Sequence, residues 1–323
     1  MKKIVWALLD DRAGSTGQVR GITSVLDHSR YEVIEKKLNY NKLAALPNFI
    51  RGSSLLGVKK ESRPQLKTDF PDIILSGSRR TAPVARWIKK QSRGKSKIVQ
   101  LLYPGFWGRS DFDLIFIPEH DRGKISGANV HFTIGSPHRV TPENLKKAKQ
   151  EWQKAFADLP RPLTAFIIGG NIKGKGFTLE NARMLGEAVK RFHAQTGGSL
   201  LITDSHRTGA EAENLIMKIV KDIPKYNYLW GDKQPNPFLG YLAEAEYLVV
   251  TGDSVSMCCE ACGTGKPVFV FEGESWLTPK HHRFVKSLFD SGHAVPLDEK
   301  NIGFKPTNSL NPAYDIAAEI ENL

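Results

Sequence analysis

Cysteine is scarce in this sequence of 323 residues, with three copies that all fall between positions 258 and 262. So few cysteines, crowded into one short stretch, exclude a disulfide framework. Two of them have C-x-x-C spacing, but a zinc site needs about four ligands and there is no second pair. We therefore expect Cys258, Cys259 and Cys262 to be small packing residues of one helix, in a protein of the reducing cytoplasm.

Long apolar runs are also missing, since no stretch approaches the roughly 20 residues that a membrane-spanning helix needs. The first apolar run, residues 4–9, is too short for the hydrophobic part of a signal peptide, and Asp10 and Asp11 follow it. We expect this run to form the first strand of a cytoplasmic protein.

The glycine motifs of two nucleotide-binding classes are incomplete. Glycine-rich turns occur at residues 14–21 and 169–176, but neither has the G-x-G-x-x-G spacing of dinucleotide-binding dehydrogenases. The second turn also differs from a Walker A loop, because Gly176 takes the place of the required Ser or Thr. A nicotinamide-dependent dehydrogenase and a P-loop nucleotidase are therefore disfavoured.

Acidic residues are scarce in the first half of the chain. Residues 1–150 contain 28 Lys and Arg against 13 Asp and Glu, whereas residues 151–323 contain 18 against 21. The excess charge predicts an anionic partner for the first half, unless it is a solvated face without a partner. Nucleic acid is disfavoured because single-strand binders need a regular array of exposed aromatic residues. An anionic lipid or saccharide is the partner that we expect.

Short apolar runs alternate with helical patterns along the whole chain. This alternation predicts an α/β protein with two consecutive Rossmann-like domains of parallel strands, joined by a short bridge. We expect an N-terminal domain at 1–140, a bridge at 141–162, a C-terminal domain at 163–305 and a segment at 306–323 whose helix returns to the first domain. One strand is predicted at 228–230.

The stretch from residue 39 to residue 67 has no clear period and mixes apolar with basic side chains. Two interpretations stay open. The stretch is either an acceptor-binding or membrane-surface segment, or an irregular loop that covers the core.

The most informative polar turn is residues 251–267, which lies between two apolar runs typical of buried parallel strands. It has room for one helix, capped by Ser254 or Ser256. A helix that begins at such a turn binds anions at its N-terminus. Glu260 lies further along this helix, where a carboxylate can accept hydrogen bonds from two ribose hydroxyls. The alternative is an ordinary crossover helix with a solvated glutamate.

Two more turns supply groups that bind phosphate. The glycine turn at 169–176 exposes backbone N–H groups and carries Lys173 and Lys175. Ser205, Arg207 and Thr208 follow the apolar run at 200–203 and offer hydroxyl and guanidinium donors suited to a diphosphate. The alternative for Ser205 and Thr208 is a capping role.

A general base, if the reaction uses one, is expected from the N-terminal domain. Asp11 ranks first because it follows the first strand beside a glycine turn. His120 ranks second, since histidine titrates near neutral pH, and Asp121 adjoins it. The predicted acceptor-binding residues are Gly14, Gly17, Arg79 and Arg80. Residues 111–113 match a D-x-D metal pattern, but at the wrong end of a strand, so no metal site is expected.

The motifs together resemble a known family. Residues 251–257 read Thr-Gly-Asp-Ser-Val-Ser-Met, and Glu260, Gly265 and Pro267 follow. With residues 118–121, 205–208, 232–238 and 264–267, they resemble the bacterial and plant "elongated mitochondria" fission-factor family over nearly the whole chain. That family is similar to GT-B glycosyltransferases, and the spacing of Glu260, Gly265 and Pro267 is similar to the nucleotide-sugar signature of MurG-type enzymes.

The resemblance implies a GT-B-like fold in which two Rossmann-like domains face each other across a cleft, with the acceptor domain at 1–140 and the donor domain at 163–305. It also implies a metal-independent glycosyltransferase without a cofactor, which moves a sugar from a nucleotide-sugar to an anionic or lipid-linked acceptor. Glu260 would hold the donor ribose, and residues 230–238 would line the nucleobase. The implied donor-binding residues are Gly169, Gly170, Lys173, Ser205, Arg207, Thr208, Asn236, Ser254, Ser256, Met257 and Glu260. The chain departs from the MurG pattern in having Asn171 after the two glycines where that pattern has serine. The alternative is a non-catalytic scaffold that binds nucleotide or lipid. Either protein would be cytoplasmic, with peripheral contact to the inner membrane as one possibility.

Overall fold

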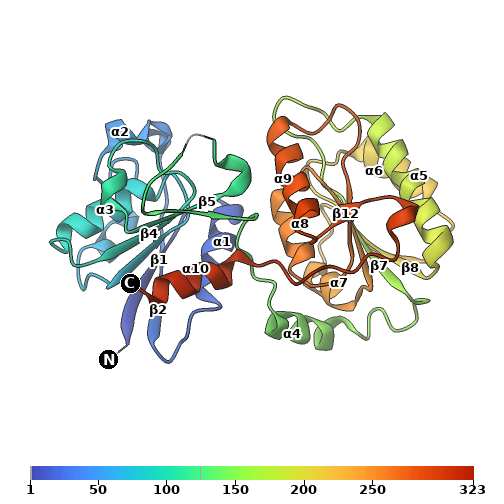
Figure 1. The fold of residues 1–323 in the computed structure, drawn as a ribbon, viewed down its shortest axis with the longest axis horizontal. Helices are drawn as coiled ribbons and strands as arrows, with labels where there is room; N and C mark the ends of the chain where they lie inside the picture. The colour runs from blue at the N-terminus through green and yellow to red at the C-terminus, as the bar shows by residue number, and fades with distance from the viewer. Residues whose placement is uncertain (1, 124) are drawn as a thin grey trace. The chain divides into compact units, whose positions relative to one another are not determined.

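The chain forms two units, each built around a six-stranded sheet (Figure 1). The computed structural model describes residues 2–123 and 125–323. The N-terminal unit comprises residues 1–139 together with 312–323, and the C-terminal unit comprises residues 140–311. Within the described residues, every pairing between the named strands is parallel. The predicted α/β fold with two Rossmann-like domains is confirmed.

The N-terminal sheet has the strand order β2-β1-β3-β4-β5-β6. Its strands are β1 (Lys3–Leu9), β2 (Tyr31–Lys37), β3 (Ile73–Ser76), β4 (Lys97–Leu101), β5 (Leu114–Pro118) and β6 (Val130–Thr133). The α-helices of this unit are α1 (Ala13–Thr23), α2 (Asn48–Arg51), α3 (Ala82–Gln91) and α10 (Pro312–Glu321). Short 3-10 helices are η1 (Lys42–Ala45), η2 (Lys60–Ser62), η3 (Pro64–Leu66), η4 (Arg109–Asp111) and η5 (Glu119–Asp121).

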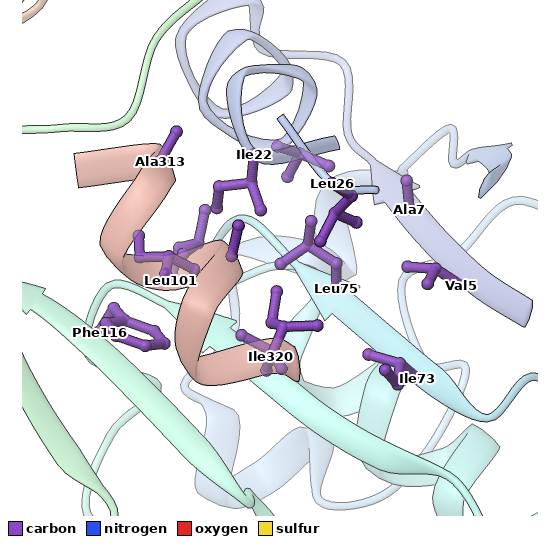
Figure 2. Packing of buried hydrophobic residues seen from close by; sticks show 14 of the residues in the cluster. Val5, Ala7, Ile22, Leu26, Ile73, Leu75, Leu101, Phe116, Ala313 and Ile320 are labelled. Carbon is purple, nitrogen blue, oxygen red and sulfur yellow. The ribbon is translucent and has the colours of Figure 1, made fainter. Parts of the chain in front are cut away.

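Side chains of the N-terminal sheet alternate between two apolar cores, as the two-residue period of a strand requires. Val5, Ala7 and Leu9 of β1 belong to a core shared with α1 and α10. Figure 2 shows this core, with Ala313 and Ile320 of α10 near side chains of α1 and the strands. The last helix of the chain therefore completes the first unit.

The opposite core covers the other face of the same sheet. Trp6 and Leu8 pack there with α3 and with side chains from the aperiodic stretch 39–67. The buried members of that stretch are Tyr40, Ala44, Val58 and Leu66. The stretch therefore covers part of the core, as one of its two interpretations predicts.

The C-terminal sheet has the order β12-β11-β10-β7-β8-β9. Its strands are β7 (Leu163–Ile167), β8 (Ser199–Thr203), β9 (Lys225–Tyr228), β10 (Tyr247–Thr251), β11 (Val268–Phe271) and β12 (Val295–Pro296). Its helices are α4 (Pro142–Trp152), α5 (Leu179–Thr196), α6 (Ala210–Ile219), α7 (Phe238–Glu244), α8 (Val255–Cys262), α9 (Pro279–Asp290) and the 3-10 helix η6 (Glu299–Asn301). No helix among the described residues is long and apolar enough to cross a membrane.

Hydroxyl side chains cap the N-termini of three helices of this unit, of which Ser254 was one of the two predicted caps of its helix. Thr141, Thr178 and Ser254 each accept a hydrogen bond from the backbone N–H three residues ahead, at the starts of α4, α5 and α8. The three cysteines are buried in α8 and form no disulfide. Burial raises the pKa of the Cys258 and Cys262 thiols well above its usual value, so these two groups stay protonated.

Two local predictions are wrong. The strand expected at 228–230 is β9 at Lys225–Tyr228, a polar strand at the sheet edge, and Trp230 lies beyond it. Gly14 and Gly17 lie inside α1 and not in a turn before it. The side chain of Asp10 accepts hydrogen bonds from the Arg12 N–H and the Ser15 hydroxyl, which orders the chain directly into the helix.

Candidate functional site

Three polar turns meet at one edge of the C-terminal sheet. The strands β10, β7 and β8 are neighbours and parallel, so their carboxyl ends lie side by side. The turns that follow them are residues 252–254, 168–171 and 204–208. The Gly170 N–H donates to Oδ2 of Asp253 at 3.0 Å, and the Asn171 N–H donates to the carbonyl of Arg207 at 2.8 Å. We call these linked turns the three-turn cluster.

The glycines after β7 allow a very close approach within this cluster. A Cβ atom on Gly169 would lie 2.1 Å from Oδ1 of Asp253, and one on Gly170 would lie 2.1 Å from the backbone of Arg207. Their N–H groups are engaged inside the protein, by the Thr251 hydroxyl at 2.7 Å and by Asp253. In this arrangement a phosphate must find its donors elsewhere in the cluster.

Arg207 is paired with a carboxylate that the sequence analysis did not single out. Its Nη1 lies 2.7 Å from Oδ2 of Asp253, whose side chain has no exposed surface, and also donates to the carbonyl of Asn171 at 3.1 Å. Among the described residues, Oδ1 of Asp253 has no hydrogen-bond partner. Arg207 is therefore held in place, and part of its charge is balanced.

Ser205 and Thr208 build the turn that carries Arg207. The Thr208 hydroxyl donates to the carbonyl of Gly169 and accepts from the Ser205 N–H. The Ser205 hydroxyl accepts from the Arg207 N–H at 3.2 Å. Both side chains are buried and stabilise the turn itself, whereas the helix α6 that follows begins after Gly209 without a side-chain cap.

The two lysines of the glycine turn differ in their surroundings. Lys175 is tied down, since its ammonium group donates to the carbonyls of Ser275 and Leu277 at 3.2 and 3.1 Å. Lys173 is exposed, and no hydrogen bond or ion pair joins it to another described residue. Lys173 is thus the lysine of this turn whose charge can reach a ligand.

Glu260 is a partly buried carboxyl group on α8. It lies four residues after the exposed Ser256, and therefore on the same face of the helix. Neither a hydrogen bond nor an ion pair joins Glu260 to another described residue. Burial raises its pKa from 4.5 to about 7. At neutral pH the group is therefore close to half protonated, and hydrogen-bond donors from a ligand would favour its ionised form.

An exposed aromatic pair lies beside the end of β8. The ring of Trp230, which is 67% exposed, lies 5.2 Å from the ring of His206. The backbone N–H of Trp230 donates to the buried Asp204 carboxylate at 2.6 Å. Burial raises the pKa of Asp204 and of Glu213, and the two carboxyl groups are hydrogen-bonded. Asp204 therefore anchors the start of the 230–238 segment.

Two family-motif residues stabilise the ends of α7. The side-chain carbonyl of Asn236 accepts from the Phe238 N–H at 2.9 Å, at the start of the helix. The ammonium group of Lys266 donates to three carbonyls at its end, those of residues 242, 243 and 245, at 2.7 to 2.9 Å. Burial lowers the pKa of Lys266 to about 8. Sequence reasoning missed this role, because partners more than 20 residues away give no local signal.

In the N-terminal unit, Asp11 and Arg80 form an ion pair, with Nη1 of Arg80 2.5 Å from the Asp11 carboxylate. Asp11 borders a hollow of about 270 Å³ at the carboxyl ends of β1 and β2, which Thr16, Arg20 and Lys37 also line. The structure thus brings one predicted base together with one predicted acceptor-binding arginine.

The other predicted acceptor residues lie around this pair. Arg79 donates to the carbonyl of Leu46 at 3.2 Å, in the stretch 39–67. Gly14 and Gly17 lie on a part of α1 where an added Cβ would meet no atom within 4 Å. They leave an open helix surface and approach nothing closely.

His120 and Asp121 are not neighbours of Asp11 in the sheet, because β3 and β4 lie between β1 and β5. His120 is buried in η5, with Nε2 3.8 Å from the Asp121 carboxylate. Asp11 is more exposed, with 47% of its side chain accessible. An acceptor therefore reaches Asp11 more readily than His120.

The D-x-D residues form ion pairs within the protein. Asp111 pairs with Arg86 and Asp113 with Lys89, each at 2.6 Å. Within residues 2–123 and 125–323, no group of three or more His, Cys, Asp and Glu side chains is placed to hold a metal ion.

Two curated proteins are similar to this chain in sequence. The uncharacterized protein RP120 of Rickettsia prowazekii is 28% identical, and the match covers 97% of each protein. The mitochondrial fission protein ELM1 of Arabidopsis thaliana is 32% identical over 73% of this chain and 59% of that protein. The chain thus spans less than two thirds of the plant protein.

Solved structures of low sequence identity share the fold. The UDP-GlcNAc 2-epimerase of Methanocaldococcus jannaschii has a TM-score of 0.61 and 13% identity over 99% of both chains. The enzyme of Neisseria meningitidis bound to UDP-GlcNAc has a TM-score of 0.54 and 12% identity, over 99% of this chain and 100% of its own. MurG of Acinetobacter baumannii has a TM-score of 0.51 and 11% identity, over 99% of this chain and 100% of its own. This chain has the GT-B fold. The family model described as "Mitochondrial fission ELM1" matches residues 13–323, and the chain belongs to that family.

Proposed function

We propose that the C-terminal unit binds a nucleotide-sugar and that its sugar is transferred to an anionic acceptor held by the N-terminal unit. Glu260 carries the proposal. It is a partly buried carboxyl group with no hydrogen-bond or ion-pair partner in residues 2–123 and 125–323, on a helix that begins at the three-turn cluster. Burial of a carboxylate without hydrogen bonds is unfavourable. The two hydroxyls of a ribose would donate the missing hydrogen bonds.

The diphosphate would lie at the start of α8. There the backbone N–H groups of the first helical turn, the Ser256 hydroxyl and the helix dipole favour an anion. Arg207 and Lys173 would add positive charge from the neighbouring turns, and stabilise the departing nucleoside diphosphate. The glycine N–H groups are engaged by Thr251 and Asp253, so Gly169 and Gly170 would act by keeping the turn close to Arg207.

The exposed ring of Trp230 would form one wall of the nucleobase site. Two solved structures of the same fold are UDP-GlcNAc 2-epimerases, and one of them is bound to UDP-GlcNAc. Uracil is therefore the first nucleobase to test. The shared fold supports a nucleotide-sugar as the ligand, and the identity of the sugar is to be determined by experiment.

On the N-terminal unit, Asp11 would accept the proton of the acceptor hydroxyl. The acceptor oxygen would form a bond to the anomeric carbon while the bond from that carbon to the diphosphate breaks. Before this step, the acid group of the acceptor would replace Asp11 as the partner of Arg80, which frees the carboxylate. The net positive charge of the unit favours such an acceptor.

A transfer assay tests this proposal. The protein is incubated with labelled UDP-sugars and with lipid and saccharide acceptors that carry an acid group, and the labelled product is separated. We expect product with the unmodified chain and at least about a hundredfold less with Asp11→Asn, the range typical of a lost general base. Asp315→Asn, at an exposed position of α10, is the matched control.

Two outcomes would contradict the transferase. Nucleotide binding without any turnover favours the non-catalytic scaffold. Conversion of the sugar without an acceptor favours epimerase chemistry, which the same fold supports in the Methanocaldococcus enzyme.

A further inference from the structure

Four large apolar side chains of the N-terminal unit are exposed on two adjoining segments. Phe49 and Ile50 are 62% and 53% exposed, and Phe106 and Trp107 are 70% and 67% exposed. The segments are fastened together by Asn48, whose amide donates to the carbonyl of Pro104 at 2.8 Å. We call these four residues the aromatic patch.

The short helix α2 is inverted relative to an ordinary surface helix. Its charged residue, Arg51, is buried to 1% exposure, while the apolar residues Phe49 and Ile50 face solvent. The Arg51 guanidinium donates to the carbonyls of Leu56 and Arg80 at 3.1 and 3.0 Å. Folding alone favours the opposite arrangement, because burial of the arginine costs desolvation and exposure of the phenylalanine forgoes apolar burial. An external apolar phase would reverse that balance.

The second segment also presents its aromatic residues outward. Phe106 and Trp107 lie between Gly105 and Gly108, both with positive φ, so the chain turns sharply on each side of them. The two rings contact each other edge to face, at 6.1 Å between centroids, and stay outside both apolar cores. The guanidinium of Arg109 lies 5.7 Å from the Phe106 ring.

The surroundings of the patch are basic. The N-terminal unit contains 25 Lys and Arg against 15 Asp and Glu. Lys42 is exposed on η1, Arg79 accepts a hydrogen bond from Asn48 through its carbonyl, and Arg109 follows the aromatic pair. Trp and Phe beside Lys and Arg are typical of segments that insert into the headgroup region of an anionic bilayer.

We propose that this unit docks on an anionic membrane surface by inserting the aromatic patch, with the neighbouring basic side chains on the lipid phosphates. Arg51 donates to the backbone of Arg80, so the patch is attached to the segment that pairs with Asp11. A lipid-linked acceptor would therefore arrive at the predicted acceptor residues. The identity of that acceptor rests on the proposed function, whereas the docking does not.

Vesicle sedimentation tests the docking. We expect the protein to bind vesicles that contain phosphatidylglycerol, to release them as salt rises, and to leave pure phosphatidylcholine vesicles unbound. The double variant Phe49→Ser/Trp107→Ser should lower the partition coefficient at least about tenfold. The control Leu179→Ser/Tyr314→Ser removes two exposed apolar side chains outside the patch, at 48% and 47% exposure, and should bind the vesicles like the unmodified chain.

Fluorescence locates the contact. Brominated lipids should quench the tryptophan emission of the unmodified protein, and Trp107→Phe should remove most of that quenching although five other tryptophans remain. Failure to bind anionic vesicles at low salt overturns the proposal, and so does undiminished quenching in Trp107→Phe. Nucleotide titration of the double variant separates membrane docking from the proposed function. If the variant no longer binds vesicles but still binds nucleotide, the aromatic patch serves docking and not nucleotide binding.

Discussion

Replacement of Glu260 by glutamine should stabilise the protein at high pH and leave its stability almost unchanged at low pH. Burial raises the pKa of Glu260 from 4.5 to about 7 in the folded chain. Between these values the folded state holds a proton that the unfolded state has released, so the stability of the unmodified protein falls as pH rises. One pKa unit corresponds to about 1.4 kcal/mol, so the shift is worth about 3 kcal/mol in total.

Urea unfolding at pH 4.5, 6, 7 and 8.5 measures this effect. Glu260→Gln removes the titrating group. The free energy of unfolding of this variant should therefore exceed that of the unmodified protein by an amount that grows with pH and reaches about 3 kcal/mol above pH 7. Glu211→Gln, at an exposed position of α6, controls for the change in net charge. A constant difference between Glu260→Gln and the unmodified protein at all four pH values would refute the reasoning, since it would mean that Glu260 is not buried as a lone carboxyl group.

Three more predictions follow from the same site. Nucleoside diphosphate binding at pH 7 should release about half a proton as Glu260 ionises, measured by calorimetry in buffers of different ionisation enthalpy, and a proton uptake would contradict the ribose contact. Gly170→Ala forces the turn away from the Arg207 backbone and should lower the free energy of unfolding by about 1–3 kcal/mol, so a change below about 0.5 kcal/mol would speak against the close approach. Asp253→Asn weakens the contact to Arg207, which is partly exposed, and should lower the free energy of unfolding by about 1–2 kcal/mol, with the loss shrinking at high salt; a salt-independent loss would point to packing instead.

The parallel strands were predictable because buried strands are short continuous apolar runs bounded by glycine or proline, as at β7, β10 and β11. The edge strand β9 was misplaced, since its sequence Lys-Tyr-Asn-Tyr is polar while the apolar pair after it, Leu229 and Trp230, looks more like a strand. At an edge, backbone pairing with a single neighbour sets the strand, and apolar content is a poor guide.

The turns that form the candidate site were predictable in position but not in their contacts. The sequence indicated Gly169, Gly170 and Arg207 as phosphate-binding groups, because such residues commonly serve that role after a strand. The structure adds Asp253, which engages both Arg207 and the Gly170 N–H across a separation of many residues. No local pattern encodes a pairing between turns of two different strands, so it needed the fold. The inverted helix α2 is similar, since Arg51 finds its partners only once the unit has folded.

Binding of a nucleoside diphosphate to the C-terminal unit tests the central claim most directly. Uridine, guanosine, adenosine and cytidine diphosphates are titrated by calorimetry into the unmodified chain and into Glu260→Ala. We predict saturable binding of at least one of them, weakened about tenfold or more in Glu260→Ala because two hydrogen bonds to the ribose are lost. Absence of binding for all four, or equal affinity in the two proteins, would contradict the account.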